Sequence, residues 1–568
     1  MPSLQFKGKN IIWNHHQSPL LPTHTLDLNN DLSYNAKNAN GNLIVEGDNL
    51  LALKALLPEY QGKVDCIYID PPYNTGNEGW VYNDKVNSPM IKDWIGQTVG
   101  KEAEDFTRHD KWLCMMTPRL KLLHQMLSDK GVIFVSIDDN EQANLKLLMN
   151  EIWGEENFIG QVVWRKKYGI QNDAKYFSTS HEYVLVFAKK LENIEFNLLD
   201  RTETQNARYS NPDNDERGDW TSGDLLVKTY NENTDYEIKT PSGKVVAPTN
   251  GGCWRVNKEK FEEMLLDSRI WFGKDGNGVP RVKRFLTEVQ QGITSTTFWD
   301  YEEVGHTDGS KKALKEIFDG KDYFDYPKPV DLVKKCIKLT TSKSSIILDS
   351  FAGSGTTAQA VLELNKEDGG NRKFVLVQMP EEVKPDTPAG KYCVENNLPL
   401  KISSITRERV RLAIEKKINP DVVDSGALEG LETERKEIGF EYYNLGTPLD
   451  SWSIISSQNN SDLPSFQKLA GYLWKNLTGE KKEFKPFKTK GVDQYLLGEY
   501  QGEKVFMLYE ADLEKLEGRE LCMSLPIAKE LEELYPNTPK LVYSPTCYLD
   551  DWHREKYQTR YINYPFGV

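Results

Sequence analysis

Residues 345–357 read SIILDSFAGSGTT, and this stretch decides the fold. Its first half is apolar and short, which is typical of a buried strand. Gly353 and Gly355 follow, and a helical pattern starts directly after them. Glycines between a strand and a helix let a ligand approach the backbone closely, and a helix N-terminus favours a negative group. The stretch therefore predicts an α/β fold with a cofactor at this turn.

Similar apolar runs lie on both sides of this stretch. They occur at residues 42–48, 64–70, 131–138, 183–188, 345–351 and 373–379, and helical patterns lie between them at 50–57, 112–127 and 356–364. This alternation predicts an open, mainly parallel sheet with helices on both faces. Ligands bind such sheets at the carboxyl ends of the strands, where the strand order reverses.

A second candidate site follows the run at 64–70, which ends in Asp70-Pro71-Pro72-Tyr73. Two prolines stop any helix and remove two N–H donors. A carboxylate and a nearby carbonyl suit an amino group with two hydrogens to donate. Pulling those hydrogens out of the ring plane would localise the lone pair of a base amino nitrogen toward an electrophile. The Tyr73 ring could stack on a base flipped out of a duplex.

The glycine turn has its own candidate ligand contacts. Asp349 could face an ammonium group, and Gln378, at the end of the next predicted strand, stands where an acidic residue usually holds ribose hydroxyls. Glu381 is the nearby alternative to Gln378. The same turn also matches a dinucleotide pattern, so alone it does not separate a nicotinamide cofactor from S-adenosylmethionine. Asp48 could either cap the helix that follows it or accept a hydrogen bond from the adenine of the cofactor.

With these motifs the chain resembles the β group of amino-DNA methyltransferases, in which Asp-Pro-Pro-Tyr precedes a Phe-x-Gly-x-Gly segment, here starting at Phe351. The resemblance implies a Rossmann-like, S-adenosylmethionine-dependent methyltransferase sheet with an inserted target recognition domain, and adenine as the methylated base. It also places Lys328, between Pro327 and Pro329, in the segment that holds the methionine end of the cofactor. Residues 181–183 also look like a family segment.

The long C-terminal extension is similar to that of the Mod subunits of type III restriction–modification systems. This likeness implies double-stranded DNA, a second copy of the chain and a helicase–nuclease subunit as partners. We expect the parts of the chain to be residues 1–159 and 324–424 for the methyltransferase halves, 160–323 for target recognition and 425–568 for assembly.

Charge and composition restrict the alternatives only mildly. The net charge of −14 is an argument against binding nucleic acid. The argument is weak, because proteins bind DNA through local basic patches. Such a patch is predicted at Arg165, Lys166 and Lys167, with Arg108 in the long loop 74–111 that also holds Trp80 and Tyr82. The seven cysteines are scattered and indicate no metal site. No signal peptide or membrane span is indicated, so a cytoplasmic protein is expected.

Other functions explain the sequence less fully. A nicotinamide dehydrogenase would use the glycines but leave Asp70 to Tyr73 without a role. Carbon-5 cytosine methylation resembles nothing here, because the chain has no Pro-Cys step. A stand-alone methyltransferase acting on adenine or on the N4 amino group of cytosine stays open, as does a non-catalytic DNA-binding subunit.

Overall fold

The computed structural model describes residues 3–17, 24–75, 107–170, 174–249, 251–289, 292–419, 437–448, 460, 463–478, 480, 482–485, 491–517 and 520–563. The chain divides into two compact units. One is formed by residues 197–295, and the other by the residues before and after them. Each unit is described by itself below.

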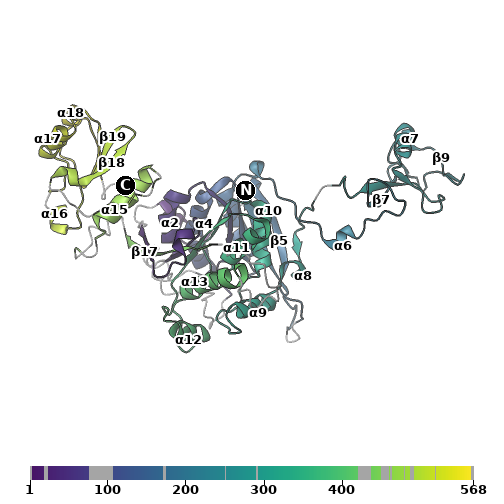
Figure 1. Ribbon diagram of the computed structural model, residues 1–568, viewed down its shortest axis with the longest axis horizontal. Coiled ribbons are helices and arrows are strands. Elements are labelled where there is room, and N and C mark those ends of the chain that lie inside the picture. The colour runs from purple at the N-terminus through teal and green to yellow at the C-terminus, as the bar shows by residue number, and fades with distance from the viewer. Residues whose placement is uncertain are drawn as a thin grey trace, which may run out of the picture. The chain divides into compact units, whose positions relative to one another are not determined.

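A ten-stranded sheet forms the centre of the larger unit in the described chain (Figure 1). Its strands are, in spatial order, β1 (His24–Leu28), β17 (Glu441–Pro448), β2 (Leu43–Glu46), β16 (Lys373–Gln378), β15 (Ile346–Asp349), β3 (Val64–Ile69), β4 (Leu127–Ile137), β6 (His181–Ala188), β5 (Phe158–Arg165) and β14 (Phe298–Trp299).

The six strands from β17 to β4 run parallel. Five of them correspond to predicted apolar runs, whereas β17 was not predicted and the run at 183–188 forms the antiparallel β6. β2, β3 and β15 are short and almost wholly buried, which is the pattern of strands covered on both faces. β1, β6 and β5 pair antiparallel with their inner neighbours. The predicted α/β class is confirmed, with a mixed sheet rather than a purely parallel one. β15 and β3 are direct neighbours, so the glycine turn and the Asp70 turn leave the sheet at the same edge.

Helices cover both faces of this sheet (Figure 1). One set packs into the largest apolar core with alternate strand residues: α2 (Asn49–Tyr60), α4 (Arg108–Met126) and α5 (Gln142–Trp153). A second set, in which α10 contacts β3 and β4 and α11 contacts β16, comprises α10 (Val330–Thr340), α11 (Thr356–Asp368) and α13 (Ile402–Ala413). A smaller core joins α13 to α9 (Thr307–Ile317) and α12 (Pro388–Glu395).

The smaller unit is narrower than the insertion predicted at 160–323. β5 and β6 belong to the central sheet, and the unit begins only at residue 197 and ends at 295. Its small core is built on Trp254, Phe261 and Phe272. Its elements are α6 (Glu203–Asn206), β7 (Trp220–Asp224), β8 (Leu226–Val227), β9 (Ile238–Lys239), β10 (Val245–Val246), β11 (Cys253–Trp254), α7 (Lys258–Leu266), β12 (Ile270–Trp271) and β13 (Arg281–Phe285).

Residues 463–563 contain a second sheet with a hydrophobic core of its own. Its strand order is β18 (Leu496–Tyr500), β19 (Glu503–Met507), β20 (Lys540–Ser544) and β21 (Thr559–Asn563), and its helices are α15 (Phe466–Thr478), α16 (Leu513–Glu517), α17 (Leu525–Leu534) and α18 (Asp551–Lys556). No helix of the described chain is long and apolar enough to cross a bilayer.

The predicted domain boundary at residue 425 differs from the structure, because β17 lies beyond it and is an inner strand of the central sheet. β17 lies between β1 and β2, and Tyr442 in it is buried. The Tyr442 hydroxyl donates to the buried Glu46 carboxylate at 2.9 Å. A run of sequence far from its partner strands gives no local sign of this pairing.

This placement predicts opposite outcomes for two truncations. A chain ending at residue 419 loses β17 and the buried Tyr442, whose removal alone is worth about 3–5 kcal/mol. We expect its thermal midpoint to fall by on the order of 10 °C or more. A chain ending at residue 448 keeps β17, and its central sheet should melt at the same temperature as in the full chain. Equal melting of the two truncated chains in calorimetry would contradict this role of β17.

Candidate active site

The chain leaves β3 at Asp70 and turns sharply through Pro71 and Pro72. The Trp112 indole N–H from α4 donates to the Pro72 carbonyl at 2.7 Å, which fixes the turn against the buried face of that helix. The Pro71 carbonyl accepts no hydrogen bond from any residue that the structure describes. The turn therefore keeps one backbone acceptor beside the Asp70 carboxylate.

Asn74 holds the far end of this turn. Its backbone is left-handed, with φ of 58°, a conformation that asparagine tolerates better than most residues. Its side-chain amide donates to the buried Glu141 and to the Arg108 carbonyl, and the Arg108 guanidinium donates to the Asn74 carbonyl at 3.0 Å. Arg108 thus begins α4 and braces the turn, whereas a DNA contact stays a prediction. Trp80 and Tyr82 lie outside the described residues.

A buried cation lies beside Asp70. The Lys328 ammonium is 3.0 Å from Asp70 Oδ1, donates to the Tyr73 hydroxyl at 2.7 Å, and is 3.4 Å from Glu182 Oε2. The Tyr73 hydroxyl in turn donates to Glu182 Oε2 at 3.0 Å. Glu182 takes a second cation, Lys166, at 2.6 Å. We call these five side chains the Lys328 cluster.

The charges of the cluster compensate one another. Burial raises the pKa of Asp70, and Glu182 adds to this, while Lys328 opposes both. Burial also disfavours the ionised form of Glu182, but the charges of Lys328 and Lys166 outweigh it and lower its pKa. The two carboxylates outweigh the burial of Lys328 and raise its pKa above the ordinary value. The two lysines therefore offset part of what burial costs the ionised forms of the two carboxylates.

The two oxygens of Asp70 face different surroundings. Oδ1 is buried on the side of Lys328, whereas 28% of the side chain is exposed. Oδ2 is thus the carboxylate oxygen on the open side. Lys328 favours the ionised form of the carboxylate against the burial that raises its pKa, and a ligand can reach the carboxylate from the side of Oδ2.

The predicted role of Lys328 differs from its position. Its side chain lies at the Asp70 turn instead of at the glycine turn, and only its carbonyl meets the latter, accepting from the Thr356 hydroxyl at 3.4 Å. Pro329 is the residue before α10, and the Lys328 side chain that precedes it reaches Asp70 directly after β3. The sequence analysis gave Glu182 no role of its own beyond the resemblance of residues 181–183 to a family segment. An acidic residue near the start of an otherwise apolar strand was the available signal.

The glycine turn joins β15 to α11. Gly353 and Gly355 have φ of 53° and 87°, so both use left-handed backbone. A Cβ at Gly355 would lie 3.2 Å from the Thr406 carbonyl of α13, whereas at Gly353 its nearest neighbour would be Phe324 at 3.5 Å. Gly355 therefore serves helix packing, whereas the space beside the Gly353 Cα is less crowded, although the Gly353 carbonyl accepts from the Thr406 hydroxyl. Phe351 is buried in the core, so its ring supports the turn from below.

Side chains hold this turn in place. The Gln378 amide oxygen accepts from the Gly353 N–H at 2.7 Å, and Gln378 is 1% exposed. A ribose contact by Gln378 stays a prediction, and the structure instead gives its oxygen a backbone partner. Arg409, also buried, donates to the hydroxyls of Ser354 and Thr356. Glu381 lies half-buried beyond β16.

Asp349 ends β15 beneath the turn. One of its oxygens accepts from the Phe351 N–H at 3.0 Å and the other from the Thr357 hydroxyl. Burial nevertheless raises the pKa of Asp349 to about 7, because these two bonds compensate only part of the lost hydration. A cation placed next to Asp349 would favour its ionised form.

Asp48 lies between β2 and α2 and connects the start of α2 to α4. It caps α2 by accepting from the N–H groups of residues 50 and 51, and it pairs with the buried Arg119 at 3.2 Å. Asn49 accepts from Arg119 and donates to the Ser350 carbonyl at 3.1 Å. The structure therefore shows the capping role of Asp48, and its contact with a cofactor stays a prediction.

The predicted DNA contacts lie at the end of β5. Arg165 is 3.3 Å from Asp300 and packs over the Tyr301 ring, and Lys166 is committed to Glu182. A phosphate contact by Lys166 would therefore require that buried pair to break. The half-buried Lys167 shows no ion pair within the described residues.

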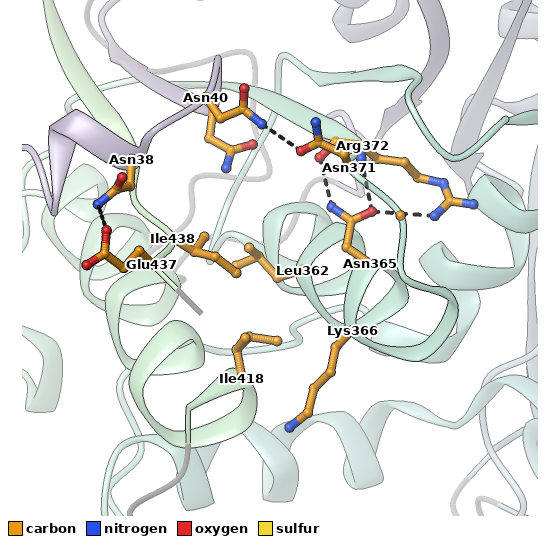
Figure 2. A pocket seen from close by; sticks show the side chains of 12 residues that line it. Asn38, Asn40, Leu362, Asn365, Lys366, Asn371, Arg372, Ile418, Glu437 and Ile438 are labelled. Atoms are coloured by element: carbon orange, nitrogen blue, oxygen red, sulfur yellow. Dashed lines mark hydrogen bonds between the residues drawn. The ribbon is translucent and has the colours of Figure 1, made fainter. Parts of the chain in front are cut away.

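A pocket of about 350 Å³ lies where β2 and β16 begin, at the edge of the sheet opposite to the two turns (Figure 2). It is lined by Asn38, Asn40, Asn42, Leu362, Asn365, Lys366, Gly370, Asn371, Arg372, Ile418, Glu437 and Ile438. Several of these residues bond one another, such as Asn40 to Asn371 at 2.6 Å and Asn38 to Glu437 at 3.0 Å (Figure 2). The pocket is thus separate from both turns, which leave the sheet at its other edge.

The Lys328 cluster predicts a specific loss of stability. Lys328→Met leaves the buried Glu182 and the partly exposed Asp70 without their shared cation, which costs up to about 3 kcal/mol in the free energy of unfolding. The two carboxylates then have pKa values above those of the unfolded chain, so the loss is largest at neutral pH and shrinks as the pH falls. Urea unfolding at neutral and at acidic pH measures both effects.

A second substitution keeps this test specific. Adding Glu182→Gln to Lys328→Met removes one of the two stranded charges and should recover part of the stability. Lys166→Met is the matched control and should lose less stability. Lys166 is more exposed than Lys328, and within the described residues its one ion pair is with Glu182. Unfolding of Lys328→Met like the wild-type chain would contradict the assigned role of the ammonium.

Comparison with known proteins is consistent with this geometry. The model of the DNA methylase family of N6 and N4 methyltransferases matches residues 64–387, which contain both turns. The StyLTI Mod subunit of a type III restriction–modification enzyme from Salmonella typhimurium is 34% identical over 81% of this chain and 70% of its own length. The EcoPI Mod subunit from Escherichia phage P1 is 30% identical over 70% of this chain and 66% of its own.

Solved structures of methyltransferases also match, at low similarity. The cytosine-N4-specific PvuII DNA methyltransferase is 12% identical, with a TM-score of 0.31 over 66% of this chain and 94% of that one. The assignment of the chain to a family therefore rests on the family model and on the StyLTI relative. The chain belongs to the N6/N4 DNA methyltransferases and, within them, to the Mod subunits of type III restriction–modification enzymes.

Proposed function

We propose that the chain methylates the N6 amino group of adenine in duplex DNA at a specific site. The observation that carries this proposal is the partly exposed Asp70 carboxylate, with Oδ1 facing Lys328 and Oδ2 on the open side, followed in the chain by a Pro71 carbonyl that accepts no hydrogen bond within the described residues. Two acceptors at one turn match the two hydrogens of an exocyclic amino group. An Asp at the first position of the motif favours adenine, and the similarity to Mod subunits agrees with this.

The residues of the glycine turn fit S-adenosylmethionine, the methyl donor of this family. The less crowded backbone at Gly353 and the buried Asp349 carboxylate would hold its methionine end, and Asp48 its adenine. When bound, the cofactor supplies an electrophilic methyl group. The turn leaves the sheet next to the Asp70 turn, so the donor and the acceptor amino group would meet between them.

The chain's own groups then prepare the amino nitrogen. Asp70 Oδ2 and the Pro71 carbonyl accept its two N–H bonds, which localises the nitrogen lone pair toward the methyl group. Because Lys328 favours the ionised form of Asp70, Asp70 acts only as an acceptor and is placed to take up the proton that the nitrogen releases. The Tyr73 ring, fixed by the bonds of its hydroxyl to Lys328 and Glu182, offers a flat surface to the flipped base.

The larger assembly is proposed from the family. A type III Mod subunit implies a restriction subunit as partner and a second copy of the chain, one copy reading the site while the other methylates. Residues 197–295 are the candidate for sequence readout, and residues 463–563, with their separate core, for assembly. The chain ending at residue 448 tests the latter in light scattering, where we expect loss of self-association.

The modified base tests the proposed reaction. DNA from cells that express the chain and lack other methyltransferases should contain N6-methyladenine at one sequence, detected by mass spectrometry of nucleosides and by sequencing. Asp70→Ala should slow the purified enzyme by about 10²–10³-fold, since it removes one transition-state contact. N4-methylcytosine in place of N6-methyladenine, or full activity of Asp70→Ala, would refute the proposal.

Asp349 predicts a pH dependence of cofactor binding. In the free chain this group loses its proton near pH 7, and the ammonium of S-adenosylmethionine prefers the carboxylate. Affinity should therefore rise as the pH increases through 7, by up to about ten-fold per pH unit on the acidic side. Calorimetry with Asp349→Asn should give weaker binding with a flat profile over this range. A variant with the wild-type pH profile would contradict the contact.

A further inference from the structure

The connection between β5 and β6, described at residues 166–170 and 174–180, exposes an unusual amount of apolar surface. Tyr168, Ile170, Tyr176 and Phe177 are 64%, 82%, 82% and 93% exposed. Soluble chains rarely place so many large apolar side chains in water within ten residues unless they bind a partner. The cost of this exposure therefore points to an interaction.

The base of this connection is fixed at the candidate active site. The N–H groups of Lys166 and Lys167 both donate to the Ser180 carbonyl, which closes the connection at its root. Directly beyond the root, Lys166 pairs with Glu182, and Glu182 accepts from the Tyr73 hydroxyl. The connection thus leaves the sheet at the edge that carries the Asp70 turn.

The side chains of the connection suit nucleic acid better than protein. Lys175 is exposed and lies 5.3 Å from the centre of the Tyr176 ring. Tyr168, nearer the root, packs against the rings of Tyr301 and His306, which leaves the outer rings of Tyr176 and Phe177 to a ligand. Flat rings next to lysines match stacked bases and phosphates, whereas lysine is depleted in protein interfaces.

We propose that Tyr176 and Phe177 stack on the DNA bases left exposed when the target base leaves the duplex, with Lys175 on a neighbouring phosphate. This inference rests on the proposed methylation of a flipped base. A base that leaves the stack costs its neighbours their stacking, and a ring inserted at that point restores it. The connection would hold the duplex open while the Asp70 turn receives the base.

A fluorescent base tests this directly. The probe is a duplex with a site that the chain methylates, in which 2-aminopurine replaces the target adenine. Its emission rises when it leaves the stack, and anisotropy of a second label reports binding. With saturating full-length protein, we expect Tyr176→Ala/Phe177→Ala to lower the ratio of extruded to stacked base on the order of ten-fold per ring. The single variant Phe177→Trp, which keeps a flat ring, should retain most of the wild-type ratio.

Two controls separate this role from general effects. Val394→Ala removes an apolar side chain that is 58% exposed in α12, a helix with no proposed role in DNA binding or assembly, and should leave extrusion unchanged. Lys175→Met should weaken binding to all duplexes and lower its salt dependence without changing extrusion at saturation.

Wild-type emission and affinity in the double variant would overturn the inference. A changed oligomeric state in light scattering with unchanged DNA binding would also overturn it, because the connection would then be a protein contact. A wild-type chain that extrudes no base and methylates no DNA would count against the proposed function itself.

Discussion

The structure of the candidate active site depends on one buried cation. The Lys328 ammonium joins Asp70, Tyr73 and Glu182, three side chains that come from the end of β3, the turn after it and the start of β6. Without a cation, two buried carboxylates so close together would not both stay ionised. Removal of one partner of such a group costs far more than the group contributes as a whole. The orientation of the Asp70 carboxylate therefore follows from a residue 258 positions further along the chain, as the numbering of the sequence shows.

The same residue links the two halves of the site. The Lys328 side chain fixes the Asp70 turn, and its carbonyl accepts from Thr356 at the start of α11. Around the glycine turn, Gln378, Arg409 and Asn49 each hold a backbone or hydroxyl group with a buried hydrogen bond. The left-handed backbone at Gly353 is thus supported from three sides. Such support keeps a cofactor turn in its binding conformation before the ligand arrives.

Local patterns predicted most of the fold and both turns. The strands before Asp70 and Gly353 were identifiable because a short apolar run with an abrupt end is a property of a few consecutive residues. Contacts between distant segments were not predictable in this way. The Lys328 side chain was assigned to the cofactor, Gln378 to a ribose and Lys166 to phosphates, and the structure gives each a protein partner. β17 was assigned to a separate domain because its sequence does not show which strands it pairs with.

We infer that Asp70 is an ionised acceptor in the resting protein and that Lys328 stabilises this ionised form. Difference infrared spectroscopy of the wild-type chain against Asp70→Asn at slightly alkaline pH measures this directly. We expect Asp70→Asn to remove a carboxylate stretching band, and Lys328→Met to convert this band into the carbonyl band of a protonated acid at the same pH. If Asp70→Asn instead removed a protonated-acid band, Asp70 would be neutral in the wild-type chain, and the inference would be wrong.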